Sequence, residues 1–324
     1  MTPSNPDAPY PALTGALTRP LRPATVVSLR PWAGSRLGGD AGEHWVAGPG
    51  SEVALPDGRM LTLDALAAEA GAALVGGRGL AMYGARFPLL VKLIDAGDWL
   101  SLQVHPSDAN ARRRHGPGAL GKAEAWLVLE ADPGAQLVVG PKMGMTGDAV
   151  RAAIAAGSMD RPDCEAVPAR AGDVFNVEPG TIHAIGAGVF IYEIEQPSDL
   201  TYRISDWGRP AIPGRSLHRD EALEAVQPER QAVLAGSQWR MDGGALTAPT
   251  FRLELVAPSM AAASRQPAGQ TLEVVTALRG EVVLRGDGWT ERLGLHETSV
   301  VPADVAAYEI GGDALSLAAV GSLP

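Results

Sequence analysis

Residues 172–195, GDVFNVEPGTIHAIGAGVFIYEIE, decide the fold. The runs 173–177 and 189–195 have the length and the Val, Ile and Phe content of strands, and a Pro-Gly pair and further glycines separate them. Similar strand candidates lie at 87–95, 99–104, 125–130 and 135–139. Helical spacing is confined to 62–71 and 146–156, with a glycine at or just after each end. Many short strands with Gly/Pro turns and few helices predict a mainly β protein built of double-stranded β-helices.

The composition limits the class of protein. The chain has 324 residues, of which 46% are hydrophobic, and this is enough for two domains. Its net charge of −10 argues against a nucleic-acid surface, and we interpret the basic run 112–114 as a solvated loop or pocket rim. The sequence lacks a long apolar run and a signal-like N-terminus, so we expect neither membrane association nor export. The one cysteine, Cys164, excludes an intramolecular disulfide and fits a cytoplasmic location.

Four residues of metal-ligand type lie in the strand-like segments. Gln103 and His105 stand at i and i+2, so both side chains leave the same face of a strand. Glu124 opens the apolar run 126–129, and His183 follows the Pro-Gly turn at the start of another strand. The alternative is four unrelated polar residues, and the grouping favours a shared site. Three strands would then close four ligands around one ion.

Imidazole, carboxylate and amide oxygen together suit a borderline divalent cation. We expect one Zn²⁺ ion, although manganese, iron, cobalt and nickel are compatible with the same ligands. An ion with four protein ligands can take a fifth from water or substrate and act as a Lewis acid.

Lysine is rare in this chain, which has 24 arginines but only Lys92, Lys122 and Lys142. An ammonium is a compact point charge that guanidinium does not replace, so we expect the lysines present to have a chemical role at the site. Lys122 lies two residues before Glu124, on the same face of that strand. Lys92 stands inside an apolar strand, where an isolated charge is costly.

The last hundred residues repeat the strand-rich style more weakly. Residues 271–284 give two alternating strands about Arg279-Gly280, and 299–308 contain a Pro-Ala turn. The ligand positions are missing, because the one histidine there, His296, falls in an expected loop. We predict a flexible N-terminal arm at 1–24, a metal-binding catalytic barrel at 25–230 and a metal-free second barrel at 231–324.

Several motifs resemble known families. Gly172-Asp173, followed by Pro179-Gly180 and His183, is similar to the second cupin motif, whereas Gln103 stands where cupins usually place a histidine. Larger blocks resemble class I mannose-6-phosphate isomerases in their short bacterial form: FPLLVKLIDAGDWLSLQVHPSD, GKAEAW, PGTIHAIGAG and YEIEQPSDLTYRISDWGR. The likeness runs from about residue 26 to 220. It implies two cupin-type double-stranded β-helix (jelly-roll) domains with a few short helices.

The resemblance also implies a reaction. In that family the zinc ligands are a glutamine, a histidine, a glutamate and a second histidine, which fall on Gln103, His105, Glu124 and His183. The implied activity is reversible conversion of D-mannose 6-phosphate into D-fructose 6-phosphate through a cis-enediol. This chemistry needs a base, a shuttle for the hydroxyl proton and an electrophile.

Candidate catalytic residues follow from the same resemblance. Arg203 matches a family active-site arginine and would stabilise the enediolate or hold the phosphate. Glu193 matches an acidic residue near the substrate and is the first candidate base, with a structural ion pair to Arg203 as the alternative. Lys122 would serve as acid, base or phosphate anchor. The substrate-binding candidates are Lys92, Ser101 and Trp126.

Three other functions stay open from the sequence. The first is an isomerase of another aldose or aldose phosphate, and the second is a non-catalytic cupin that binds a sugar or a metal. The third is a dioxygenase-type cupin, which Gln103 disfavours because a histidine is usual at its position. The full ligand set together with Lys122, Glu193 and Arg203 favours catalysis. We expect a small sugar-phosphate substrate, no nucleic-acid or membrane partner, and a monomer or homodimer.

Overall fold

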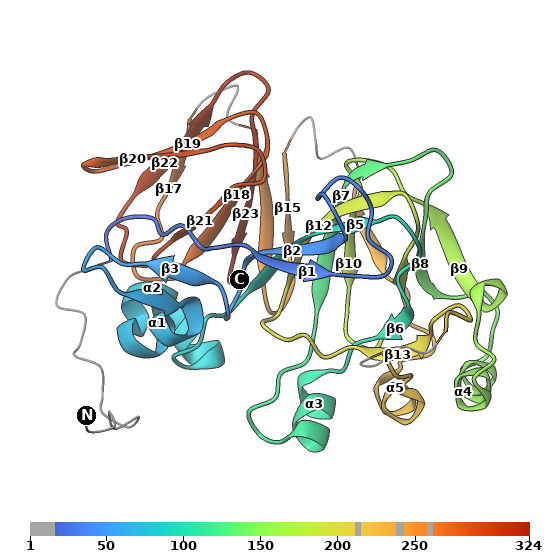
Figure 1. Cartoon of the computed structure of the whole chain (residues 1–324). Helices are drawn as coiled ribbons and strands as arrows, with labels where there is room; N and C mark the ends of the chain where they lie inside the picture. Colours follow the sequence, from blue (N-terminus) through green and yellow to red (C-terminus); the bar gives the residue numbers. More distant parts are fainter. Residues whose placement is uncertain (1–16, 211–214, 238–242, 258–261) are drawn as a thin grey trace, which may run out of the picture.

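The antiparallel strands of this chain close into two barrels that lie side by side (Figure 1). The computed structural model describes residues 17–210, 215–237, 243–257 and 262–324. Each barrel is made of facing sheets of short strands, and helices connect strands rather than build a layer of their own. The predicted mainly β fold with two cupin-type barrels is confirmed.

The first barrel has a seven-stranded sheet that faces a set of shorter strands. In spatial order the large sheet contains β1 (Val26–Leu29), β2 (Ala41–Ala47), β5 (Leu90–Ala96), β12 (Val189–Glu195), β7 (Glu124–Ala131), β10 (Val174–Val177) and β14 (Val233–Gly236). The facing strands are β11 (Ala184–Ile185), β8 (Gln136–Pro141) and β9 (Cys164–Pro168), with the pair β13 (Tyr202–Ser205) and β6 (Leu102–Val104). A bridge between Gln103 and His183 joins β6 to this facing set.

The second barrel pairs a five-stranded sheet with a four-stranded one. The larger sheet contains β15 (Gly244–Thr247), β16 (Arg252–Val256), β23 (Leu317–Ser322), β18 (Glu273–Arg279) and β21 (Thr298–Val301). The smaller contains β17 (Ala263–Arg265), β22 (Tyr308–Gly312), β19 (Val282–Gly286) and β20 (Trp289–Leu293). The two strands predicted about Gly280 are present as β18 and β19, and they lie in different sheets, so the chain crosses the barrel there.

Strand β12 is buried on both faces, which explains its nearly continuous apolar sequence. Phe190, Tyr192 and Ile194 point toward the second barrel and share a core cluster with Leu253 and Val274. The alternate positions of β12 face the interior of the first barrel. One strand therefore forms both the wall of the first barrel and the packing surface for the second.

Helices α1 (Leu63–Ala70) and α4 (Gly147–Ala156) confirm the two helical predictions. The hydroxyls of Thr62 and Thr146 accept the N–H groups of Ala65 and Ala149, which satisfies donors at each N-terminus. Helix α4 ends at Gly157, whose φ of 68° is left-handed and suits glycine.

Three further helices were not predicted. The basic run 112–114 lies in α3 (Asp108–His115) and not in a loop, which corrects our interpretation. Its helix has no apolar face to recognise, because Ala111 is buried while the arginines are exposed. Ser107 caps its N-terminus, and Arg114 pairs with Glu221 and Glu224. The others are α2 (Ala72–Tyr83) and α5 (Arg219–Ala225).

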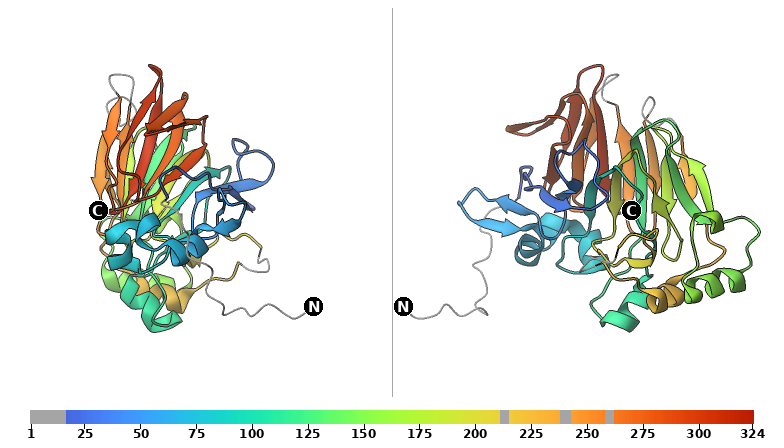
Figure 2. Two further views of the ribbon diagram at one scale, coloured as in Figure 1. Left: turned by 90° about the vertical axis from the view of Figure 1, so that its left-hand side faces the viewer. Right: turned by 45° about the vertical axis from the view of Figure 1, so that its right-hand side comes forward.

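The helices gather at one end of the molecule (Figure 2). Helices α3, α4 and α5 lie along the first barrel, whereas α1 and α2 lie toward the second, beside the short hairpin of β3 (Glu52–Ala54) and β4 (Met60–Thr62). Within the described ranges, every helix is too short or too polar to cross a lipid bilayer.

The boundary between the two barrels lies later in the chain than the predicted limit at residue 230. Strand β14 lies after the predicted limit at 230, yet it pairs with β10 in the first barrel. We therefore propose a boundary between Gly236 and Gly244. Residues 1–16 of the predicted arm lie outside the described residues, while Leu17 and Leu21 are buried, and Leu21 exchanges backbone hydrogen bonds with Val300 of the second barrel.

The contact between the barrels can be tested at Gly321. A Cβ atom there would lie 2.7 Å from the Cδ1 atom of Ile194, so we expect Gly321→Ala to lower the free energy of unfolding by about 1 kcal/mol or more. Valine lacks this Cδ1 atom, so the same change in an Ile194→Val background should cost less. Urea unfolding of both single variants and the double variant gives the coupling. Strictly additive effects would contradict this packing contact.

Candidate active site

Strand register brings the predicted residues of the large sheet together. Lys92 on β5 lies opposite Glu193 on β12, and Glu193 lies opposite Trp126 on β7. In the neighbouring row of the same face, Glu195 lies opposite Glu124. Directly opposed residues have Cβ atoms about 5 Å apart, so these side chains meet inside the first barrel.

The facing strands supply the other half of the site. Gln103 on β6 pairs with Arg203 on β13 and, through the isolated bridge, with His183. His105 follows two residues after Gln103, just beyond the end of β6. Possible ligand atoms of His105, Glu124 and His183 all lie within 4.8 Å of one another, and the three side chains are buried. The structure thus gathers all four ligand candidates at one point.

Both histidines turn Nε2 toward Glu124. Nδ1 of His105 contacts the carbonyl oxygen of Leu200, and Nδ1 of His183 that of Thr181, each at 2.9 Å. A carbonyl only accepts, so the neutral rings carry their proton on Nδ1 and a lone pair on Nε2. These Nε2 atoms lie 3.2 and 3.3 Å from the two carboxylate oxygens of Glu124. Lone pairs that converge in this way, each ring oriented by a carbonyl, fit a metal centre.

Electrostatics favour the ligand form of these groups. Burial lowers the pKa of both His105 and His183, in the latter to about 4. Burial would raise the pKa of Glu124, but the Lys122 ammonium holds it well below its usual range. Neutral imidazoles and an ionised carboxylate are the forms that bind a cation.

The amide of Gln103 is oriented by its neighbours. Its Nε2 atom lies 3.2 Å from Nε2 of His183, and its oxygen accepts the Ser101 hydroxyl at 3.3 Å. A half-turn of the amide exchanges oxygen and nitrogen, which would bring the oxygen to the ligand group. Ser101 is buried beside the set, as expected for a pocket position.

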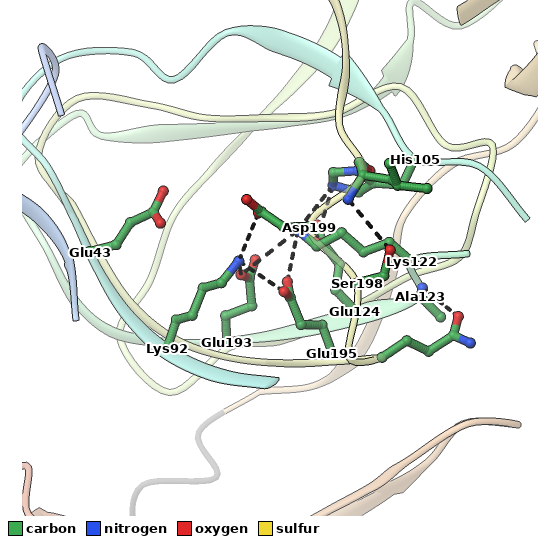
Figure 3. A network of polar contacts seen from close by, with 12 residues as sticks. Glu43, Lys92, His105, Lys122, Ala123, Glu124, Glu193, Glu195, Ser198 and Asp199 are labelled. Carbon is green, nitrogen blue, oxygen red and sulfur yellow. Dashed lines mark hydrogen bonds and ion pairs between the residues drawn. The ribbon is translucent and has the colours of Figure 1, made fainter. Parts of the chain in front are cut away.

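Two buried ammonium groups lie among carboxylates next to the ligand group (Figure 3). Lys122 Nζ is 2.8 Å from Glu124 and 2.7 Å from Glu195. Lys92 Nζ is 2.8 Å from Glu195 and 3.4 Å from Glu193. Burial lowers the pKa of each lysine, but the carboxylates outweigh it and raise both, so the ammonium forms persist.

Sequence reasoning missed Glu195, the carboxylate that bridges the two lysines. It is fully buried, and burial raises its pKa while the ammonium groups act in the opposite direction. Glu195 stands two residues after Glu193, so the i, i+2 rule that grouped Gln103 with His105 would have found it.

A cavity of about 280 Å³ adjoins this cluster. Among the predicted residues, it is lined by Lys92, Ser101, Gln103, Lys122, Glu193 and Arg203. Trp126 is absent from the lining: it is fully buried behind Glu193 and donates its indole N–H to that carboxylate at 3.1 Å. Trp32 is the tryptophan that lines the cavity.

The alternative ion pair between Glu193 and Arg203 does not form. Glu193 contacts Lys92 and Trp126, whereas Arg203 donates to the carbonyl oxygen of Ser216 at 2.8 Å. In the described part of the chain Arg203 has no carboxylate within ion-pair distance. Both side chains therefore reach the cavity with capacity for a ligand.

Glu43, on the cavity wall, gives a pH-dependent test. Burial alone would raise its pKa, but Lys92 and Arg30 lower it to about 2. A carboxyl with a depressed pKa stabilises the fold above its unfolded value of 4.5, and this contribution disappears as the pH falls toward 2. We expect Glu43→Gln to lower the free energy of unfolding by about 3 kcal/mol at pH 7, with the difference shrinking below pH 4.5.

Urea unfolding at several pH values between 7 and 3 measures this difference. Glu52→Gln on the exposed part of β3 is the control and should change stability by less than about 0.5 kcal/mol. A constant deficit for Glu43→Gln across the range would show that the charge of Glu43 is not what stabilises the wall.

Comparison with known proteins agrees with this geometry. A family model described as phosphomannose isomerase type I, catalytic domain, matches residues 41–120. A mannose-6-phosphate isomerase of Streptococcus mutans is 34% identical over 233 residues, which is 70% of this chain and 72% of that protein.

Solved structures show the same fold. The mannose 6-phosphate isomerase of Bacillus subtilis superposes with a TM-score of 0.73 at 24% identity, over 93% of this chain and 99% of that one. A mannose 6-phosphate isomerase solved with zinc bound gives 0.69 at 16% identity, over 94% and 100%.

The barrel, the converging imidazole and carboxylate ligands and the adjoining cavity define a cupin of the metal-dependent enzyme class. Given the extent of its match to the streptococcal enzyme, the chain belongs to the class I mannose-6-phosphate isomerase family. The resemblance read from the sequence is thereby confirmed.

Proposed function

We propose that this protein interconverts D-mannose 6-phosphate and D-fructose 6-phosphate through a cis-enediol, at a site that holds one zinc ion. The observation that carries the proposal is the convergence of His105, Glu124 and His183 beside a cavity lined by Lys92, Lys122 and Arg203, in a chain of this family.

His105, Glu124 and His183 would hold the ion, with the amide oxygen of Gln103 as a fourth ligand after its half-turn. Imidazole and carboxylate ligands without a thiolate support zinc, which a structural neighbour also contains. When bound, the ion would supply Lewis-acid stabilisation for the carbonyl and enediolate oxygens of the sugar.

Glu193 is our candidate for the base. One of its oxygens accepts the indole N–H of Trp126, and the other, Oε2, lies 3.4 Å from the Lys92 ammonium, so the carboxylate is held in one orientation at the cavity wall. It would take the proton from C2, so that the C–H electron pair forms the C1=C2 bond and the carbonyl pair moves to O1. Transfer of the O2 hydroxyl proton to O1 then moves the negative charge to O2. Return of the first proton to C1, as the O2 electron pair forms the C2 carbonyl, gives the ketose.

Lys122 and Arg203 would stabilise the negative charge of the enediolate. The Lys122 ammonium is anchored by Glu124 and Glu195 and lines the cavity, so it can donate a hydrogen bond to a substrate oxygen. Arg203 lies opposite Gln103, at the same end of the cavity. Lys92 and Ser101 would contact the sugar hydroxyls, and Trp126 would act by fixing Glu193.

Removing a ligand tests the metal centre. We expect wild-type protein to contain about one zinc per chain by elemental analysis. His183→Ala should lose most of its zinc, because the three remaining ligands bind the ion weakly. Turnover of mannose 6-phosphate in a coupled assay should fall at least about 100-fold in this variant. A His183→Ala protein with full zinc content would refute the assigned ligand set.

Arg203→Ala separates catalysis from metal binding. This variant should keep its zinc, because Arg203 is not a ligand, but lose turnover by about 100-fold or more, since removal of one group that stabilises a transition-state charge costs about this much. The same assays on both sugar phosphates provide the measurement. Zinc-loaded wild-type protein without isomerase turnover would refute the proposed activity.

A further inference from the structure

Positive groups of the cavity extend beyond those used in the proposed reaction. Arg215 and His218 line it together with Arg203. The segment that carries them runs beside β13: His218 N–H donates to the carbonyl oxygen of Arg203 at 2.8 Å, and Arg203 Nη1 donates to that of Ser216. Since Gln103 pairs with β13 from the other side, Arg215 and His218 lie one segment further from the metal ligands.

Arg215 is held rigidly by a single carboxylate. Its Nη2 and Nε atoms lie 2.7 and 3.3 Å from the two oxygens of Asp206, and the side chains are only 12% and 13% exposed. Asp206 also pairs with Arg209 at 2.7 Å. Asp206 is thus shared by two guanidinium groups, and since Asp98 also contacts Arg209 at 3.3 Å, Arg215 is the one that depends on Asp206 alone.

Arg203 brings a positive charge to the cavity that is not balanced in this way. Its Nε atom is buried and has no acceptor, and no carboxylate in the described residues pairs with it. Burial first, and then repulsion from Arg215, lowers the pKa of Arg203. Partly buried cations that repel one another are costly unless an anion lies between them.

His218 presents a donor at the same place. Its Nδ1 accepts the backbone N–H of Arg203 at 3.1 Å, so the proton of the neutral ring is on Nε2. Burial is the largest influence on the pKa of His218 and lowers it, as does Arg203. Asp206 occupies the Nε and Nη2 side of Arg215, which leaves Nη1 as a donor for a ligand. A guanidinium oriented in this way, with a neutral N–H donor in the same cavity, suits a phosphate.

We propose that Arg215, positioned by Asp206, and His218 form the subsite that binds the phosphate of the substrate. This inference rests on the proposed function and deepens it. The sugar would extend from the metal ligands past Arg203, with C1 and C2 at the ligand group and the C6 phosphate at Arg215. Arg215 then determines specificity for a phosphorylated aldose.

The test compares wild type with Arg215→Met on two substrates, mannose 6-phosphate and unphosphorylated D-mannose. The variant should raise KM for mannose 6-phosphate about 10- to 100-fold with kcat within about 3-fold, since it removes a buried charge-assisted contact. Its kcat/KM for D-mannose and its zinc content should be unchanged. Asp206→Asn, which releases Arg215, should raise the same KM.

Inorganic phosphate provides a readout that does not depend on turnover. Calorimetry should show phosphate binding to zinc-loaded wild type and at least about 10-fold weaker binding to Arg215→Met. The control is Arg114→Met, which removes ion pairs to Glu221 and Glu224 of α5 but lies outside the cavity, and it should match wild type.

The outcomes separate the two proposals. Unchanged KM for mannose 6-phosphate and unchanged phosphate affinity in Arg215→Met would overturn the subsite, as would an equal loss on D-mannose, which indicates a structural role. A wild type that binds phosphate through Arg215 but fails to isomerise mannose 6-phosphate would keep the subsite and refute the proposed reaction.

Discussion

Glu195 holds two ammonium groups at 2.7 and 2.8 Å inside the first barrel, and the rest of the site depends on this double ion pair. An unpaired lysine in this dry interior would lose its charge. With Glu195 between them, Lys92 and Lys122 stay cationic and are held apart, one beside Glu193 and the other beside Glu124. The arrangement gives the cavity fixed positive charges that need no reorganisation when charge develops on a substrate.

Much of this site could be predicted from strand geometry, because spacing of two residues fixes the face of a strand. The rule grouped Gln103 with His105 and Lys122 with Glu124, and the structure brings all four together. The same spacing places Glu195 on the face of Glu193. Spacing does not show how deeply a side chain is buried, and Trp126 lies on the expected face but behind Glu193. Helix α3 and the Arg215 segment carry no apolar periodicity, and their positions depend on ion pairs formed only in the folded chain.

The side chains that line the cavity include more cations than carboxylates, although the protein as a whole is acidic. Five cationic side chains line it, Arg30, Lys92, Lys122, Arg203 and Arg215, against the acidic Glu43, Glu193 and Asp199. The chain as a whole has a net charge of −10. Long-range attraction therefore contributes little to capture of an anionic ligand, and short-range contacts inside the low-dielectric cavity must supply the affinity.

Strand β12 presents carboxylates to the cavity on one face and Phe190, Tyr192 and Ile194 to the second barrel on the other. This double use makes the catalytic half inseparable from its neighbour. A chain cut after the first barrel would expose a broad apolar wall to water, directly behind the reacting groups. The smallest unit that keeps this wall covered is accordingly the pair of barrels, so the second barrel supports the strand that carries the carboxylates.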